Sequence, residues 1–254
     1  MPRQCPLRPI AVLLTALHLT VLRLTVLSLC LCLQATPLVA GAWQREAGTG
    51  FASLSFWPAL DGGGNYTALF AEWGLSPRLT LGLDAGRSVS GQTKAVVFLR
   101  APVMAWADNR IAAEIGWGEI AGQRVIRPGL SFGRSLDTAY GAGWFAADTV
   151  LELDLETRDM DIKADITLGF TPSSASGPPA PWTAMLQLQT GIVALRESLL
   201  QLREAGIRPK PSFLRIVPSV TYRLRDGVDL ELGFYHSLTG SDERGGKLGL
   251  WIRF

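Results

Sequence analysis

From residue 43 onward, apolar and polar residues alternate with a period of two in many short segments. In residues 79–88, the apolar set is Leu79, Leu81, Leu83 and Ala85, and the set between them is Thr80, Gly82, Asp84 and Gly86. A period of two places such sets on opposite faces of a β-strand. Gly, Pro, Asn and Asp residues between the segments are typical of turns. The pattern therefore predicts an all-β chain.

About twelve such strands are predicted. They lie near residues 49–57, 65–75, 79–88, 95–106, 110–118, 125–135, 143–155, 161–170, 182–193, 213–224, 227–238 and 247–254. Ten residues at about 3.3 Å each, tilted by roughly 40°, rise about 25 Å, the height of the apolar band of a transmembrane barrel. No segment after residue 42 is a continuous apolar run long enough to cross a bilayer as a helix. The sequence favours a single antiparallel up-and-down transmembrane β-barrel over residues 43–254.

Charged residues in the middle of the predicted strands indicate which face meets lipid. An Arg or Lys that faces lipid at the bilayer midplane costs about 2–4 kcal/mol. Several together would exceed the stability of a typical domain, about 5–15 kcal/mol. The charged, glycine-rich face is therefore predicted to line the lumen, and the leucine face to contact lipid. A soluble periplasmic β-sandwich that binds a ligand would show the same alternation with the faces exchanged, so the period alone leaves this alternative open.

The predicted lumen contains charges of both signs. The charged residues expected to line it are Glu72, Asp84, Arg100, Glu114, Arg127, Asp148, Lys163, Asp165, Arg215, Arg223, Asp229, Glu231 and Arg253, together with Glu152 and Lys247. These charges would either form a salt-bridge network that fills a closed barrel or line a polar conduit. About eight strands leave a filled interior and about sixteen leave an aqueous channel, so about twelve strands are intermediate and do not decide between these alternatives. Such charge pairs more often stabilise a barrel than conduct, which favours a narrow or plugged barrel.

The chain ends in a segment with apolar residues at every second position, namely Leu248, Leu250, Ile252 and Phe254. This ending resembles the C-terminal signature of bacterial outer-membrane β-barrels. In that family the barrel-assembly machinery recognises the last strand, which then closes the barrel against the first. The family usually has an aromatic residue third from the end, where this chain has Ile252.

Two further stretches, Glu72–Leu83 and Pro218–Leu224, resemble outer-membrane barrels that are uncharacterised or taken to be transporters. With the terminal strand they cover about a fifth of residues 43–254 and are weakly specific, because barrel strands give less signal than transmembrane helices. The resemblance implies the cell outer membrane as the location. It implies the lipid bilayer, the barrel-assembly machinery and periplasmic chaperones as partners.

Residues 1–42 are predicted to be a signal peptide. Two arginines near the start precede an apolar run over residues 10–33, and Ala40-Gly41-Ala42 forms a small-residue cleavage site before Trp43. An internal arginine and the length of the run leave a retained membrane anchor as the alternative. All three cysteines precede residue 33, so the predicted mature chain contains no disulfide and no cysteine metal site.

Removing this leader changes the charge balance. Three of the 24 basic residues and none of the 22 acidic residues lie in the leader, so the remainder of the chain is close to neutral. No basic patch is present that would indicate nucleic acid as a partner.

Turn lengths test the barrel prediction, because both ends of such a chain lie in the periplasm and every second connection should be short. The connections 76–78, 107–109 and 225–227 are short as expected, and the longer external loops are expected at 58–64, 89–94, 119–124 and 239–246. Connections 136–142 and 171–181 are long where short turns are expected.

Six tryptophans lie near predicted strand ends, as in interfacial girdles. They are Trp57, Trp73, Trp106, Trp117, Trp144 and Trp182. Residues 194–205 have leucines at helical spacing before a glycine, which predicts a short helix in the external loop that follows the ninth strand. This helix would pack on the barrel rim or act as a lid or plug; alternatively, the ninth strand continues to about residue 196.

His236 is the only histidine after the leader, which excludes multi-histidine zinc sites there. Barrel-type outer-membrane lipid hydrolases pair a histidine with a serine two residues on, whereas Ser237 directly follows His236 and falls on the opposite face. No GxSxG, HExxH or Walker motif occurs. The stretch Asp61–Asn65 lacks the ligand spacing of a calcium loop and is interpreted as a turn. Neither a metal nor a cofactor is expected.

The sequence thus favours an outer-membrane barrel with a passive role, either as a narrow channel for transport or as a structural protein, without catalysis. Two alternatives remain: an outer-membrane lipid hydrolase or deacylase that uses His236, and the soluble periplasmic sandwich.

Overall fold

The computed structural model describes residues 41–60, 64–88, 90–173, 178–195, 212–240 and 242–254. Within these residues the chain forms twelve strands: β1 (Gly50–Trp57), β2 (Tyr66–Ser76), β3 (Leu79–Ser88), β4 (Thr93–Trp106), β5 (Asn109–Ile120), β6 (Gln123–Thr138), β7 (Gly141–Asp154), β8 (Met160–Pro172), β9 (Trp182–Ile192), β10 (Phe213–Arg225), β11 (Val228–Thr239) and β12 (Arg244–Arg253). In the described part of the chain, no helix is both long enough and apolar enough to cross a membrane.

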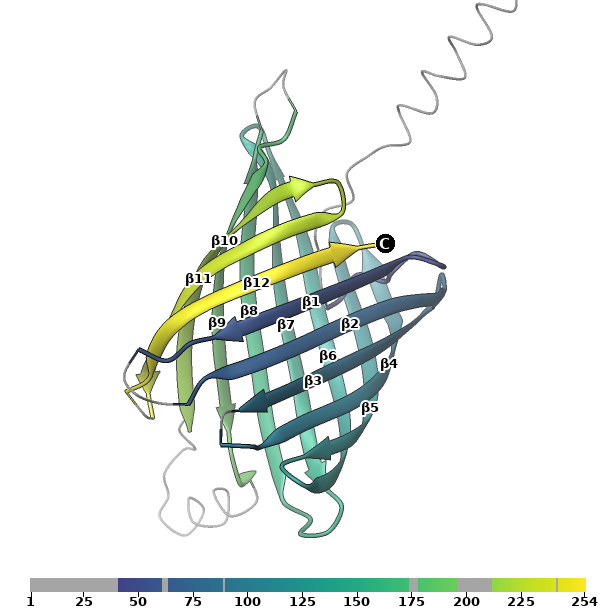
Figure 1. Cartoon of the computed structure of the whole chain (residues 1–254). Coiled ribbons are helices and arrows are strands. Elements are labelled where there is room, and N and C mark those ends of the chain that lie inside the picture. The colour runs from purple at the N-terminus through teal and green to yellow at the C-terminus, as the bar shows by residue number, and fades with distance from the viewer. Residues whose placement is uncertain (1–40, 61–63, 89, 174–177, 196–211, 241) are drawn as a thin grey trace, which may run out of the picture. The chain divides into compact units, whose positions relative to one another are not determined.

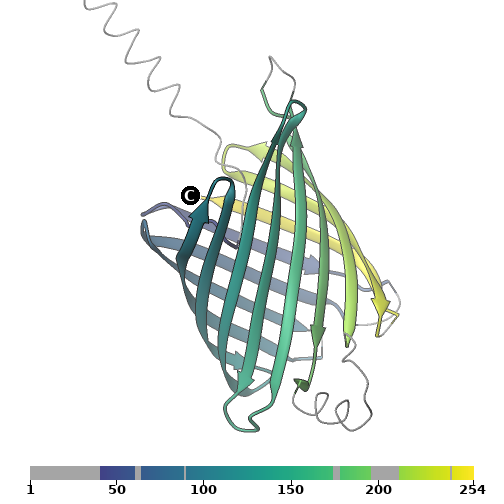
Figure 2. The ribbon, with the colours of Figure 1, turned by 180° about the vertical axis from the view of Figure 1, so that it is seen from behind.

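The strands form one closed antiparallel barrel in which every strand pairs with its neighbours in sequence, and β1 pairs with β12 (Figures 1 and 2). The predicted up-and-down barrel of about twelve strands is confirmed. The sandwich alternative is wrong, because a sandwich needs two packed sheets and this sheet closes on itself. Closure leaves none of its strands with an unpaired edge.

The C-terminal strand closes the barrel. Phe51 of β1 lies opposite Arg253 of β12, and Leu54 lies opposite Leu250. The backbone N–H of Phe254 donates to the carbonyl oxygen of Gly50 at 3.1 Å, which extends the pairing to the last residue. The pairing that the terminal pattern implies is therefore present, whereas recognition of that strand by an assembly machinery stays a prediction.

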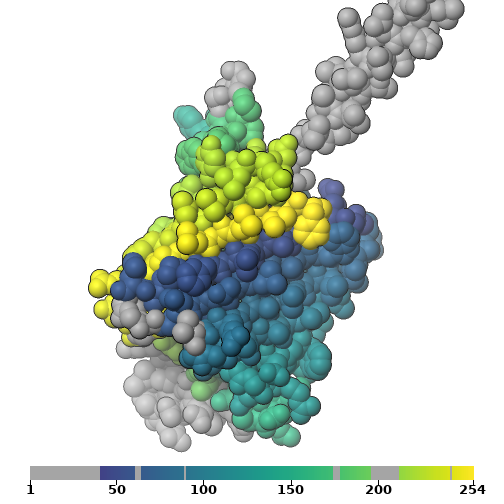
Figure 3. Space-filling view, in the orientation of Figure 1, coloured from purple at the N-terminus to yellow at the C-terminus, as the bar shows by residue number. Residues whose placement is uncertain are grey.

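The two faces of the sheet differ sharply in exposure. Leu69, Leu232 and Leu248 are 38%, 52% and 47% exposed, whereas Glu72 and Glu231 are 2% and 1% exposed. The leucine face is therefore on the outside of the barrel and the charged face is inside. Figure 3 shows β12, β1 and β2 side by side in this continuous outer surface. Only hydrocarbon or detergent would solvate such a surface without the cost of exposing it to water.

Two connections differ from the predicted lengths. Strands β6 and β7 extend further than the sequence predicted, so Ala139 and Tyr140 alone join them, and the seven-residue connection at 136–142 is wrong. The external loop predicted at 119–124 is also wrong, because Ala121 and Gly122 form a two-residue turn. Their φ angles of 52° and 85° are those of a type I′ hairpin turn, which matches the twist of the flanking strands. Alternation weakens near turns, so the sequence prediction ended these strands short of the turns.

The girdle prediction holds for some tryptophans and fails for others. Trp73, Trp106, Trp117 and Trp182 are exposed on the outside. Trp144 is buried, and its ring lies over Gly169, where a Cβ would be 2.2 Å from the indole. Trp57 donates from its indole nitrogen to Ser55, a buried residue, at 2.9 Å. Both follow the inward phase of their strands, so these two residues are interior and not interfacial.

Two other predictions lie outside the described residues. They are the signal peptide, of which residues 1–40 are not described, and the helix predicted at 194–205, of which residues 196–205 are not described.

Candidate functional site: the barrel lumen

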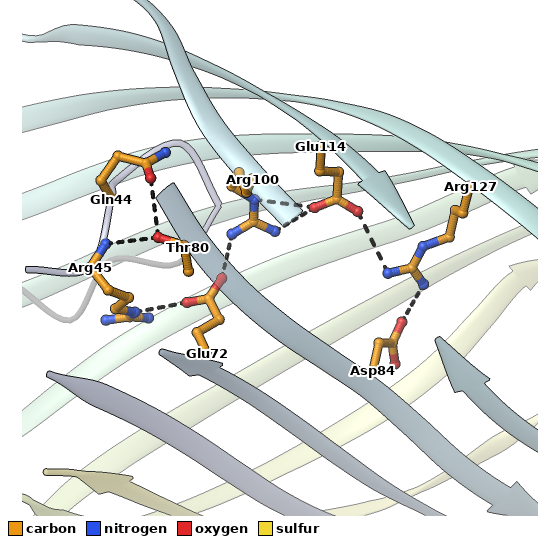
Figure 4. A network of polar contacts seen from close by, with 8 residues as sticks. All are labelled: Gln44, Arg45, Glu72, Thr80, Asp84, Arg100, Glu114 and Arg127. Carbon is orange, nitrogen blue, oxygen red and sulfur yellow. Dashed lines mark hydrogen bonds and ion pairs between the residues drawn. The ribbon is translucent and has the colours of Figure 1, made fainter. Parts of the chain in front are cut away.

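One wall of the lumen, from β2 to β6, carries a connected ion-pair network (Figure 4). Arg100 pairs with Glu72 and, through Nη2, with Oε2 of Glu114 at 2.7 Å. Arg127 pairs with Glu114 at 3.5 Å and with Asp84 at 2.5 Å. We name these five residues the ion-pair wall. All five were predicted to line the lumen, and the structure brings them into one network.

The register of the barrel explains why these residues meet. Arg100 and Glu114 are directly opposite each other on β4 and β5, and both point inward. The Phe98 ring lies 4.9 Å from the guanidinium carbon of Arg100 and 5.8 Å from that of Arg127. A cation over an aromatic face gains electrostatic attraction, so Phe98 adds a contact beside the carboxylates. Buried charges of this kind are stable only when paired, which is the case for each member of the wall.

Two bases that the predicted set of lumen charges did not include extend the ion-pair wall. Arg45 donates from Nε to Glu72 at 2.7 Å, and Lys94 pairs with Asp84 at 2.8 Å. Lys94 shares the inward phase of Arg100 but lies one residue before the predicted strand, so a more generous boundary would have found it. Arg45 precedes β1 and follows no strand period, so the sequence offered no signal for it.

The remaining predicted lumen charges form smaller pairs. On β11 and β12, Lys247 pairs with Glu231 at 2.7 Å, and Arg253 pairs with Asp229 at 2.8 Å. The hydroxyl of Ser219 and the indole nitrogen of Trp251 also donate to Glu231, at 2.9 and 3.0 Å.

Three more predicted bases lie on the strands between these groups. Lys163 pairs with Glu152 at 2.5 Å. Arg215 pairs with Glu243 at 2.6 Å. Arg223 lies opposite Asp229 in the register of β10 and β11, and no ion pair of its side chain is seen among the described residues.

Asp148 and Asp165 differ from the other interior acids. They are directly opposite each other on β7 and β8, and no base pairs with either among the described residues. Asp148 Oδ1 is buried and accepts no hydrogen bond within the described part of the chain. We name these two residues the acid pair. Like charges opposite each other destabilise a sheet, so the acid pair needs a compensating cation or proton.

Residues 41–46 run inside the barrel ahead of β1 and cover this region. Ala42 is 2% exposed, and the Trp43 ring fills the space above Gly133, where a Cβ would lie 2.2 Å from it. Trp43 also packs against the buried cluster of Trp144, Ala146 and Met185. We name residues 43–46 the N-terminal segment. The sequence assigned it to the barrel but gave no indication that it enters the lumen.

Polar contacts fix the other end of the N-terminal segment against the ion-pair wall. The hydroxyl of Thr80 donates to the side-chain oxygen of Gln44 at 3.1 Å and accepts from the Arg45 backbone N–H at 3.3 Å. The Arg45 guanidinium carbon lies 4.7 Å from the centre of the Phe51 ring. Figure 4 shows Gln44 and Arg45 pointing toward Thr80 and Glu72. The segment therefore bridges the two walls of the lumen.

The histidine and the serine of the hydrolase alternative lie on opposite faces of β11. His236 follows Leu232 and Phe234 at two-residue steps, which places it on the outer face, while Ser237 is on the other face. The nucleophile and base of a hydrolase need to be within hydrogen-bond reach of each other, and this arrangement separates them. Among the described residues, no cluster of three or more His, Cys, Asp or Glu side chains could hold a metal ion.

Comparison with known proteins identifies the fold. No family model matches the sequence, and no curated protein matches it. Among solved structures, the chain is similar to the KdgM porin, with 8% identity, a TM-score of 0.56, and coverage of 80% of this chain and 99% of that one. It is also similar to the NanC porin, with 9% identity, a TM-score of 0.56, and coverage of 79% and 98%. A KdgM structure in complex with disordered oligogalacturonate gives a TM-score of 0.54 at 9% identity, with coverage of 80% and 99%. The chain thus has the fold of an outer-membrane β-barrel.

Proposed function

We propose that this protein is an outer-membrane barrel, exported by means of the signal peptide 1–42, that acts as a narrow passive conduit for small polar solutes without catalysis. The observation that supports this most directly is the division of the sheet into a leucine-rich outside and an interior of charges of both signs. The outside is suited to hydrocarbon, and the inside offers hydrogen-bonding groups to a solute that has lost part of its water shell.

The charge pattern narrows the class of solute. The arginines of the ion-pair wall are each neutralised by one or two carboxylates. Paired charges leave a small net field, which gives little attraction for a polyanion. One KdgM structure is described as a complex with oligogalacturonate, which is polyanionic. For this chain we therefore propose neutral or zwitterionic solutes of small size as the cargo.

Conductance in a planar bilayer tests the conduit. We expect small, discrete current steps in potassium chloride, with a reversal potential near zero in a salt gradient because the lumen is balanced in charge. Swelling of proteoliposomes should be faster in a neutral monosaccharide than in oligogalacturonate of equal osmolarity. A folded barrel that is silent in both assays would contradict the conduit and leave the structural role.

Location and catalysis are tested separately. Fractionation should recover the protein in the outer membrane, with migration on a gel that changes after heating. The alternative activity, lipid hydrolysis, would use His236. Replacing His236→Ala should leave lipid turnover by the purified barrel at its background level, and a loss of turnover on this replacement would support the hydrolase.

Assembly is the third part of the proposal. We propose that the barrel-assembly machinery and periplasmic chaperones act on this chain through Leu248, Leu250, Ile252 and Phe254. The backbone pairing between Phe254 and Gly50 supports this, because the last residue takes part in closure. Deleting Phe254 should lower the yield of heat-modifiable barrel in cells several-fold. Refolding of the same variant in detergent, without the machinery, should be affected less.

A further inference from the structure

Asp148 of the acid pair lies directly beside Gly41, a residue of the predicted cleavage site. A Cβ built on Gly41 would be 2.2 Å from Asp148 Oδ1 and 2.8 Å from its Oδ2. Gly41 has a φ of +79°, a conformation that favours glycine. Trp43 follows two residues later, so its Cα lies at most about 7.6 Å from that of Gly41. The predicted first residue of the mature chain is therefore within a short reach of the carboxylates.

Cleavage before Trp43 would change the electrostatics at this place. Hydrolysis of the Ala42–Trp43 peptide bond by an export peptidase consumes one water and leaves a carboxylate on the leader and an amino group on Trp43. With a reference pKa of about 8, an α-amino group is largely protonated at neutral pH. Removing Gly41 and Ala42 also vacates the space against Asp148. Processing thus produces a cation and room for it beside the acid pair.

We propose that Asp148 and Asp165 form the binding site for the α-ammonium group of the processed N-terminus. This ion pair holds the N-terminal segment in the lumen as a plug. The inference rests on the export step of the proposed function, and not on conduction. The other predicted interior acids are paired with bases, whereas Asp148 and Asp165 face each other without one among the described residues. The proposed ion pair explains this difference, because the missing base is created only when the leader is removed.

The rest of the N-terminal segment is already anchored in a way that suits a plug. The Trp43 ring is fixed by Gly133 and by the cluster around Trp144, and Arg45 is fixed by Glu72. The free amino group would therefore be the third point of attachment. Arg45 is attached to β2, the Trp43 ring lies against β6, and the amino group would be attached to β7 and β8. The segment would therefore span the interior and narrow the passage at this level.

The experiment measures the protection of the α-amino group in the mature barrel. The protein is purified from outer membranes, its intact mass identifies the first residue, and the folded barrel is treated briefly with a soluble amine-reactive reagent at neutral pH. Mass spectrometry of the N-terminal peptide then gives the labelled fraction. We expect the native N-terminus to be labelled at least tenfold more slowly than in the D148N/D165N double variant. Asn keeps the shape of Asp, and heat-modifiable migration checks that the variant is folded.

The matched control is Asp226→Asn, which removes an acid from the turn between β10 and β11 and should leave labelling slow. Retention of the leader would overturn the proposal. Labelling of the native N-terminus as fast as in the double variant would overturn it as well. A first residue at Gly41 would also overturn it, because Gly41 and Ala42 would then still fill the space against Asp148.

Conductance separates this inference from the proposed function. If the acid pair retains the plug, D148N/D165N should conduct more than the native barrel and approach a variant that lacks residues 43–46. Slow labelling of a silent native barrel would support the ammonium site while contradicting the conduit. Fast labelling of a conducting barrel would contradict the ammonium site while supporting the conduit.

Discussion

The two walls of the lumen differ in how their charged side chains are paired. The ion-pair wall on β2 to β6 contains arginines and carboxylates that pair with one another across two to four strands of the sheet. The opposite arrangement is found on β7 and β8, where Asp148 faces Asp165 without a base and residues 41–46 cover them. The charges of the first wall are paired by residues of the sheet, whereas the acid pair of the second wall lies against a segment that precedes the sheet. We propose that the first wall stabilises the barrel and that the second binds the N-terminal segment in the lumen.

The largest effect should follow from breaking the ion-pair wall at its centre. Arg100→Ala removes the base that Glu72 and Glu114 share, and it leaves Glu72 with Arg45 and Glu114 with only the longer 3.5 Å contact to Arg127. Removing one partner of a buried pair typically costs about 3–5 kcal/mol, which should appear in the free energy of unfolding of the barrel in guanidinium. Arg124→Ala is the control, since Arg124 and Glu156 are exposed and 3.4 Å apart, and such pairs contribute about 0–1 kcal/mol. Equal effects of both variants would mean that the wall contributes little stability.

The outside of the same wall should be nearly as sensitive, for a different reason. Leu81 of β3 is 37% exposed on the outer face, directly after the inward Thr80. Leu81→Arg places a cation in the apolar band at about 2–4 kcal/mol, so the yield of inserted, heat-modifiable barrel should fall. Leu81→Ala, the control for side-chain size, should insert nearly normally. Normal insertion of the arginine variant would contradict the assignment of the outer face to lipid.

The N-terminal segment should respond to a change on β6, the strand beside the second wall. Gly133→Val puts atoms where the Trp43 ring now lies. Overpacking of this kind costs about 1–3 kcal/mol, and expelling Trp43 from the lumen would relieve it. We expect higher conductance and faster labelling of the N-terminal amine, with little change in the unfolding of the barrel. Gly64→Val is the control, because a Cβ there meets nothing within 4 Å and Gly64 is not among the glycines with a positive φ.

The smallest effect is expected for Glu114→Gln. Arg100 keeps Glu72 and Arg127 keeps Asp84 when Glu114 loses its charge, so neither base is left alone. We expect a loss of about 1 kcal/mol, the size of one ordinary hydrogen bond, in the same unfolding assay. A loss as large as that of Arg100→Ala would mean that Glu114, and not Arg100, is the centre of the ion-pair wall.

The sequence alone determined that the chain is all-β and which side chains share a face, because a period of two records this directly. The closed barrel was distinguished from a sandwich only by the structure. Fifteen charged positions were assigned to the inside on the basis of the period, and the structure places Glu72, Arg100 and Glu231 among its buried residues. Boundaries at 119–124 and 136–142 were wrong because the alternation weakens near the two-residue turns, although the strands still pair there.

Only the tertiary structure decided which charges meet. Pairing across three or four strands depends on the register and stagger of the closed sheet, which the local period does not contain. The same holds for Trp43 and Arg45, whose positions in the lumen follow from contacts with Gly133 and Glu72, at sequence separations far beyond any local pattern. The alternation of a chain determines which side chains face inward, but closure of the barrel determines which of these side chains contact one another.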